Sequence, residues 1–211
     1  LEEKLVRRAR KEEMGEFAKH EVYEKVAIEE WWNVTGAAPI GTRWVDVHKG
    51  DERNPEYRSR LVAKEVKTSR REDRFAATPP LEAMKIILSL AVTGGIGYNT
   101  GCKSGGHKLE FIDVRRAYCH AAGRREVYVE LPEEDEHPGM CSNLKAMYGT
   151  RDAAQNWEHA YTEFLEGAGF VRGTATPCVF HNRGRDIYLV VHGDNFIVLA
   201  LSLIHISEPT R

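Results

Sequence analysis

Two aspartates stand at the ends of apolar runs, where a carboxylate can bind a cation. Asp194 lies in VVHGDNFIVLA, between two apolar runs, and Asp113 ends the run KLEFID. In phosphoryl-transfer sites Mg2+ is bound by one or two carboxylates together with substrate phosphates, so two such residues brought together would suit that chemistry. Gly, Asp and Asn are also the usual residues of hairpin turns, and a lone strand-end Asp is more often a turn or cap residue. Neither position identifies a site by itself.

The most basic part of the sequence follows a predicted β-ribbon. Alternation in TRWVDVHK (42–49) and again over residues 57–66, across the turn residues GDERNP, predicts two paired strands. A period of two places Arg58, Arg60 and Lys64 on one face. Four further cations follow: Lys67, Arg70, Arg71 and Arg74. This face would suit phosphate binding, but a solvated sheet face has the same composition, and the residues alone favour the solvated face.

Composition limits the classes of protein to which the chain can belong. Its 211 residues, 42% of them hydrophobic, are enough for one medium domain or two small ones. Thirty Lys and Arg against thirty-two Asp and Glu give a net charge of -2, so a polyanion must be met by a local patch. The cysteines Cys102, Cys119, Cys141 and Cys178 form neither a zinc motif nor a dense disulfide framework, which favours a reducing compartment. No apolar run reaches the roughly 18 residues of a membrane span.

Two helices and three further strand regions must position these residues. A helix starts after Pro79 and Pro80, with Leu81, Met84, Leu88 and Ala91 predicted to face the core. A second helix follows Asp152 and ends at Gly167 and Gly169. Its apolar stripe consists of Trp157, Tyr161 and Leu165. Strands are predicted over residues 108–114 and 127–131, and a hairpin over residues 186–200. Strands and helices without regular alternation favour an α+β fold with a largely antiparallel sheet.

The two ends of the chain differ from its middle. Residues 2–19 have a charge-laced helical pattern in which Leu5, Ala9 and Phe17 are too sparse for a strong apolar face, which predicts a solvated leader helix over residues 1–19. The chain does not begin with Met, and its opening is not a signal peptide, so we expect an excerpt from a longer reading frame. The last eleven residues, LSLIHISEPTR, resemble the translation of a sequencing-library adapter, although Leu201 and Leu203 would also extend the preceding strand. We expect function within residues 20–200 and none in residues 201–211.

Four sequence blocks stand in order along residues 20–200. They are RSRLVAKE (58–65), FIDVRRAYCHA with EVYVELPE (111–121 and 126–133), LKAMYGTRDAAQNW (144–157) and VVHGDNFIVLA (190–200). In this order and spacing they resemble the reverse transcriptase domain of copia-type LTR retrotransposons. The resemblance implies the fingers and palm of a right-hand polymerase, with a mostly antiparallel palm sheet and the thumb missing. It implies an RNA-directed DNA polymerase that adds deoxynucleotides to a primer 3′ end by two-metal nucleotidyl transfer.

The resemblance assigns roles to individual residues. Asp113 and Asp194 match catalytic aspartates that bind two Mg2+ or Mn2+ ions, with the carbonyl of Val114 as an extra ligand. Tyr118 matches the aromatic residue beneath the sugar of the incoming nucleotide. Further matches to nucleotide-binding positions are Tyr148 and Gly149 at the templating pocket, and Lys49, Arg58 and Arg60 on the fingers ribbon.

The hairpin departs from the family pattern. Where the family has Tyr-x-Asp-Asp, this chain has His192, Gly193, Asp194 and Asn195. The third catalytic position, Asn195, therefore offers a neutral oxygen in place of a charge, which weakens the site. Thr150, Asp152 and Ala154 also depart from the usual Leu, Gln and Pro.

The implied partners are an RNA or DNA template with its primer, deoxynucleoside triphosphates, and the RNase H and integrase regions of the polyprotein, with no membrane. The implied location is cytoplasmic, in a virus-like particle. Because of Asn195 and the missing thumb, we expect little or no polymerase activity from this chain. Two alternatives are a non-catalytic remnant that keeps the fold with at most weak nucleic-acid binding, and an unrelated α+β domain.

Overall fold

The structure, a computed structural model, describes residues 2–51, 53–65, 76–93, 107–135, 137, 140–144 and 147–201. Several predictions fall outside this range: the cations Lys67, Arg70, Arg71 and Arg74, the cysteine Cys102, and all but the first residue of the tail 201–211. The described chain divides into two units, which we treat separately. The first unit comprises Leu1–Phe75 and Tyr118–Trp157, and the second comprises Ala76–Ala117 and Glu158–Arg211.

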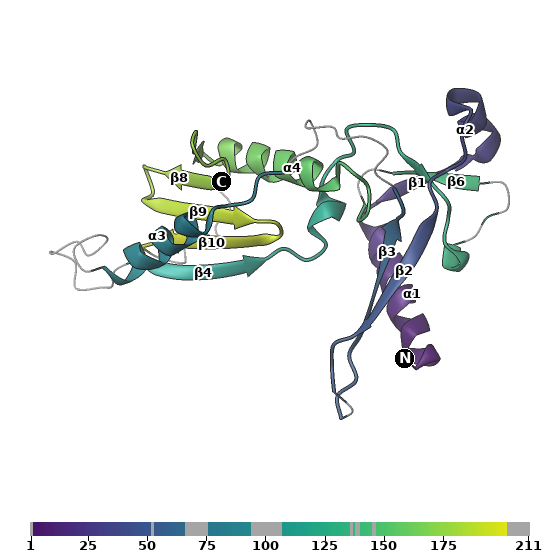
Figure 1. The fold of residues 1–211 in the computed structure, drawn as a ribbon, viewed down its shortest axis with the longest axis horizontal. Helices are drawn as coiled ribbons and strands as arrows, with labels where there is room; N and C mark the ends of the chain where they lie inside the picture. The colour runs from purple at the N-terminus through teal and green to yellow at the C-terminus, as the bar shows by residue number, and fades with distance from the viewer. Residues whose placement is uncertain are drawn as a thin grey trace. The chain divides into compact units, whose positions relative to one another are not determined.

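The first unit combines a ribbon, a small sheet and helices (Figure 1). Its helices are α1 (Glu3–Lys19), α2 (Ile28–Thr35) and the short helix η3 (Glu133–Asp135). Its strands are β1 (Tyr23–Ala27), β2 (Thr42–His48), β3 (Tyr57–Ala63), β5 (Tyr128–Val129) and β6 (Met140–Leu144). β2 and β3 form an antiparallel ribbon, and the sheet has the order β1-β6-β5 with antiparallel pairs.

The ribbon confirms the period-two prediction. Ser59, Leu61 and Ala63 are buried along β3, whereas Arg58 and Arg60 alternate with them and belong to the other face. Leu61 joins a core with Phe17 of α1 and with Val22, Val129 and Met147.

The prediction of a solvated leader helix is wrong for one side of α1. Val6, Ala9, Glu13 and Phe17 are buried, and Phe17 is only 2% exposed. These four residues recur every three or four positions, so they form one continuous stripe. Val6, which the sequence prediction did not include, is the buried apolar residue one turn before Ala9 and extends the stripe toward the start of α1. α1 is thus built into the first unit.

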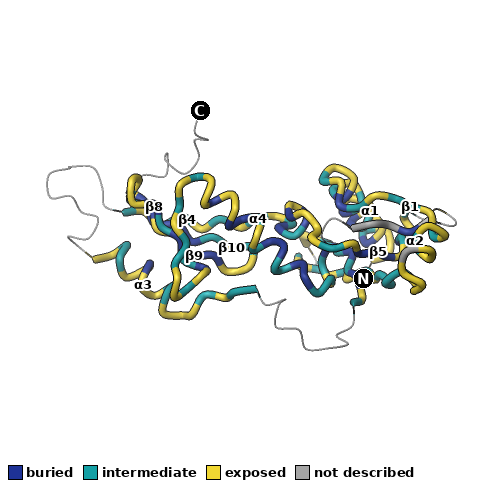
Figure 2. Tube along the Cα trace, turned by 90° about the horizontal axis from the view of Figure 1, so that it is seen from above, coloured by how far each residue is buried: buried dark blue, intermediate teal, exposed yellow. Residues whose placement is uncertain are grey.

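The second unit is a five-stranded antiparallel sheet with the order β4-β10-β9-β8-β7. Its strands are β4 (Lys108–Asp113), β7 (Val171–Arg172), β8 (Val179–Asn182), β9 (Ile187–His192) and β10 (Asn195–Ala200). Its helices are α3 (Leu81–Val92) and most of α4 (Ala153–Gly167), while a short helix, η2 (Ala117–His120), and α4 each run across the division between the units. The central strands hold most of the unit's buried residues, including Val190, Val191 and the run from Ile197 to Ala200 (Figure 2).

The two helices cover opposite faces of this sheet. Ile87 of α3 packs against Val190 and Ile197, whereas Tyr161 of α4 makes an edge contact with Phe196, whose ring lies 5.8 Å away between centroids. Phe196 and Ile197 are consecutive in β10, so their side chains point to opposite faces.

The predicted stripe of α4 is confirmed, because Trp157, Tyr161 and Leu165 are all buried. The predicted stripe of α3 is confirmed for Met84, which packs against the core of the second unit, and is wrong for Leu81 and Leu88. Ile87 is its buried residue, while Leu81 and Leu88 are 59% and 41% exposed. Ala83 and Met84 pack beside Ile87, and the small Ala83 lets this side of the helix approach the sheet.

Several elements of the fold were not predicted from the sequence. The strands β1, β6, β7 and β8 and the helix α2 had no sequence prediction. Cys119, Cys141 and Cys178 are buried and form no disulfide with one another. Among the described helices, none has the length and apolar character needed to cross a membrane.

Candidate active site

The tip between β9 and β10 is a two-residue turn made by Gly193 and Asp194. Gly193 has a φ of +64°, and Asp194 has a negative φ. A positive φ at the first turn residue alone is the pattern of a type II′ hairpin turn, for which Gly is the favoured residue. The buried strand residues Val190, Val191 and Ile197 anchor the turn on both sides. Asp194 is therefore held at a defined place.

The pairing of β10 with β4 brings Asp113 to this turn. Asn195 lies directly opposite Asp113 in the antiparallel register. The amide of Val114 donates to the carbonyl of Asp194, with an N–O distance of 2.9 Å. Because Val114 and Asp194 form the hydrogen-bonded pair, Asp113 and Asn195 form the non-hydrogen-bonded pair, in which side chains lie closest and share a face.

The structure thus brings together the four predicted residues Asp113, Val114, Asp194 and Asn195. The side-chain amide Nδ2 of Asn195 donates to Oδ1 of Asp194 at 2.9 Å. Asp113 and Asn195 are exposed and Asp194 is half-buried. The set offers two carboxylates and one neutral amide group where β4 ends and β10 begins.

Oxygen donors of this kind suit Mg2+ or Mn2+, which prefer carboxylates and fill their remaining positions with water and substrate phosphates. Asp113 and Asp194 are the residues that would hold such an ion. Within the described part of the chain, however, no group of three or more His, Cys, Asp or Glu side chains is arranged around a common metal position. At the hairpin, the acids brought together are Asp113 and Asp194, and Asn195 beside them is neutral.

A second group of predicted residues gathers in the first unit, at the base of the ribbon. The guanidinium of Arg60 lies over the ring of Tyr148, 5.4 Å from its centroid. The rings of Tyr118 and Tyr148 meet edge to face, with their centroids 4.8 Å apart. The carbonyl of Tyr148 accepts from the amide of Ala63 at 2.8 Å. Arg60 and the two tyrosines therefore form one cluster beside β3.

Gly149 belongs to this cluster for a steric reason. Its φ is +87°, and a Cβ at this position would lie 2.1 Å from the carbonyl oxygen of Ala63. Only glycine fits so close to the ribbon backbone.

The other two predicted cations lie farther along the ribbon. Arg58 stands opposite Val47, while Arg60 stands opposite Val45. Lys49 follows β2, and its amide donates to the carbonyl of Glu56 at 2.8 Å. Lys49 and Arg58 are therefore near the turn of the ribbon, and Arg60 is nearer its base.

Arg43 was missed by the sequence reasoning. It lies opposite Val62 and is exposed on the same face as Arg58 and Arg60. Val45 and Val47 are exposed between these cations, at 37% and 44%. The period of two, continued back along β2, is the signal that identifies Arg43.

The predicted residues therefore divide between the two units. The set of strand-end acids belongs to the unit with the five-stranded sheet, and the set of cations and tyrosines belongs to the unit with the ribbon.

The chain is similar to proteins of one kind. The family model described as reverse transcriptase (RNA-dependent DNA polymerase) matches residues 28–207. The chain is 26% identical over 209 residues to the retrovirus-related Pol polyprotein from transposon TNT 1-94 of Nicotiana tabacum, covering 95% of this chain and 14% of that protein. It is 26% identical over 170 residues to the Pol polyprotein from transposon RE2 of Arabidopsis thaliana, and 25% identical over 170 residues to that from transposon RE1 of the same plant. Each of these two matches covers 75% of this chain and 11% of the relative.

Proposed function

Since the chain belongs to the reverse transcriptase (RNA-dependent DNA polymerase) family, we propose that it is the fingers and palm of a copia-type retrotransposon polymerase. The ribbon unit corresponds to the fingers and the five-stranded sheet unit to the palm. Its substrates are deoxynucleoside triphosphates and a primer on an RNA or DNA template, and its setting is a polyprotein with RNase H and integrase regions, in the cytoplasm. The chain spans about a seventh or less of its relatives' length, so partners elsewhere in the polyprotein belong to this proposal.

The observation that carries the proposal is the register at the hairpin. Asp113 is opposite Asn195, and the backbone of the next pair, Val114 and Asp194, is hydrogen-bonded. This pairing supports a role for Asp113 and Asp194 as ligands of two Mg2+ or Mn2+ ions, with the carbonyl of Val114 as an extra ligand. When bound, the ions supply charge neutralisation at the reacting phosphate and lower the pKa of the attacking hydroxyl.

The protein's own residues bind and orient the substrates. Lys49, Arg58 and Arg60 attract the triphosphate, since each carries a positive charge on the ribbon. Tyr118 limits the space beneath the sugar of the nucleotide, and its ring is fixed by its edge contact with Tyr148. Tyr148 and Gly149 shape the templating pocket next to β3.

Asn195 favours a second candidate function. A neutral amide at the third acidic position weakens cation binding, which suits a remnant that keeps the fold and binds nucleic acid weakly through its basic face.

Primer extension with Mg2+ or Mn2+ distinguishes the two functions. We expect weak extension by the purified chain, greater with Mn2+ than with Mg2+, and none by the Asp113→Asn variant. Glu163→Gln is the matched control, because Glu163 is an exposed acid on α4 of the same unit. If extension by Asp113→Asn equals that of the wild type, the catalytic proposal is wrong. If the wild type binds an oligonucleotide without extending it and Asn195→Asp does not restore extension, the remnant is favoured.

A further inference from the structure

α1 contacts the ribbon near both of its ends and in its middle. It lies outside the residues matched by the family model. At its start, the amide of Glu2 donates to the hydroxyl of Tyr57 at 3.2 Å. At its end, Phe17 packs with Leu61 in the core of the first unit. Between these two points, Arg10 reaches the inner face of β2.

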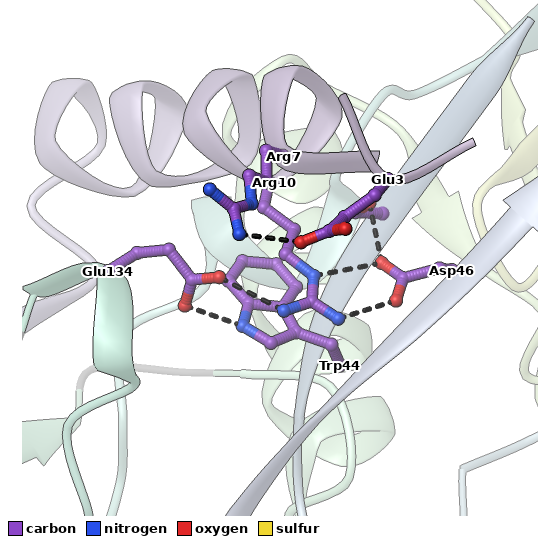
Figure 3. A network of polar contacts seen from close by, with 7 residues as sticks. Glu3, Arg7, Arg10, Trp44, Asp46 and Glu134 are labelled. Atoms are coloured by element: carbon purple, nitrogen blue, oxygen red, sulfur yellow. Dashed lines mark hydrogen bonds and ion pairs between the residues drawn. The ribbon is translucent and has the colours of Figure 1, made fainter. Parts of the chain in front are cut away.

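Arg10 joins three elements through one guanidinium (Figure 3). Its Nε and Nη2 donate to the two carboxylate oxygens of Asp46 on β2, at 3.2 and 2.7 Å. Its Nη1 donates to Oε1 of Glu134 on η3 at 3.1 Å. A bidentate pair fixes direction as well as distance, because the planar fork of arginine matches the carboxylate.

Two neighbours hold the acids in place. Trp44 Nε1 donates to Oε2 of Glu134 at 2.7 Å, and the Trp44 ring lies beneath the guanidinium, 5.2 Å from ring centroid to carbon. Ser59 donates its hydroxyl to Oδ1 of Asp46 at 2.7 Å. We call Arg10, Asp46, Glu134, Trp44 and Ser59 the arginine clasp.

The charged side chains of the clasp are partly buried. The side chains of Arg10, Asp46 and Glu134 are 26%, 16% and 25% exposed. The hydrogen bonds from Arg10 hold the pKa of Asp46 below its ordinary value. By contrast, the pair of Arg7 with Glu3 on the same helix is more than three-quarters exposed, and exposed pairs of this kind contribute little.

The clasp also separates charges across the ribbon. Asp46 is the only acid in β2 and β3, and it belongs to the inner face, which packs against α1. Arg43, Arg58 and Arg60 alternate to the other face. The inner acid is thus paired with a cation of α1, and the charged residues on the outer face of the two strands are all cations.

We propose that Arg10 is a positioning residue that holds the ribbon so that its basic outer face can receive a polyanion. The identification of the polyanion as a deoxynucleoside triphosphate rests on the function proposed above. In the absence of Arg10, the ribbon loses one of its ties to α1 and one to η3, and Asp46 loses the cation with which it is paired.

The test uses the intact 211-residue chain and two measurements. Hydrogen exchange of the β2 and β3 amides reports how firmly the ribbon is held, and calorimetry with dTTP reports polyanion affinity. Arg10→Met removes the clasp, Arg10→Lys keeps the charge without the fork, and Arg7→Met is the matched control on the exposed side of α1.

We expect Arg10→Met to raise ribbon exchange and weaken dTTP binding about tenfold, the loss expected when about a tenth of the molecules keep the ribbon in its binding position. Arg10→Lys retains more than half of this loss, because an ammonium group lacks the planar set of donors that pairs with both Asp46 and Glu134. Arg7→Met changes neither measurement.

Two results separate the possible failures. If Arg10→Met leaves both the ribbon exchange and dTTP affinity of the folded protein unchanged, or if Arg10→Lys fully restores them, the positioning role is wrong. If the wild type does not bind dTTP, the proposed function is contradicted, while the ribbon exchange still decides whether Arg10 holds the ribbon.

Discussion

The residue directly opposite Asp113 at the hairpin is Asn195, whose side chain is neutral. Its side-chain amide donates to the carboxylate of the preceding residue, Asp194, so these two consecutive residues are linked by a hydrogen bond at the turn. An amide needs no cation to neutralise it. A third acid, by contrast, would be repelled by its neighbours until a divalent ion is bound.

We therefore predict that Asn195→Asp lowers stability without a divalent cation and raises it with Mn2+. Like charges opposite each other on paired strands cost roughly 0.2–1 kcal/mol, and bound cation reverses the sign by favouring the folded state. Thermal melts with and without Mn2+ measure both changes. Asn195→Ala is the control, since it removes the amide without adding charge, and an equal Mn2+ response from the two variants would contradict the assignment.

Gly149 and Gly193 both have positive φ, but their surroundings differ. A Cβ on Gly149 would collide with the backbone of Ala63, whereas a Cβ on Gly193 meets no atom within 4 Å. We predict that Gly193→Ala costs about 1 kcal/mol from backbone strain alone. Gly149→Ala adds the collision and costs about 3 kcal/mol or more. Denaturant unfolding measures the difference, and equal costs would show that the ribbon yields to the added methyl group.

At the scale of elements, the tie between α1 and β2 makes the ribbon sensitive to acid. Hydrogen bonds from Arg10 lower the pKa of Asp46 below its ordinary value of 3.8. A carboxylate with a lowered pKa in the folded state stabilises above its unfolded pKa, and the contribution is lost as the pH falls through the folded pKa.

We accordingly predict that Asp46→Asn reduces stability by about 1.5–3 kcal/mol at neutral pH, the range for hydrogen bonds to a charged group. The difference from the wild type should shrink below about pH 4, where Asp46 of the unfolded chain begins to bind a proton, and should be lost as the pH falls through the lower pKa of the folded state. Unfolding curves over this pH range test it. A difference that stays constant with pH would mean that the charge of Asp46 contributes nothing.

Elements with a local pattern could be predicted from the sequence, and those that depend on distant partners could not. The ribbon and the hairpin around Gly193 follow from alternation and turn residues within a few positions. β1 was missed because its five residues pair with β6, far along the chain, and they do not alternate on their own. The side of α3 that faces the sheet depends on how closely Ala83 approaches it, which periodicity does not specify.

The same distinction applies to the site. Asp113 and Asp194 could be identified as candidates because each follows an apolar strand and lies in a block that resembles the family. Their register could not, since a shift of one residue between β4 and β10 would exchange the faces of every side chain. Arg10 could not be identified either, because its partners Asp46 and Glu134 come from two remote segments.

At the scale of the whole molecule, each unit has a hydrophobic cluster of its own. Phe17, Leu61 and their neighbours form a cluster in the first unit. Ile87, Val190 and Ile197 form one in the second. No residue belongs to both clusters. Each core buries its own helix against its own strands, so damage to one core should act first on the elements that enclose it.

We predict that Phe17→Ala and Ile87→Ala destabilise different elements of the intact chain. Phe17 is 2% exposed and Ile87 3%, and truncations of such side chains cost about 3–5 and 2–5 kcal/mol respectively. Hydrogen exchange should increase mainly in β2 and β3 for Phe17→Ala, and mainly in β9 and β10 for Ile87→Ala. Phe164→Ala is the control, because Phe164 is 75% exposed on α4 and its truncation leaves no cavity. If both core variants raise exchange equally in all four strands, the two units unfold as one, and the ribbon cannot be loosened independently of the sheet that holds Asp113 and Asp194.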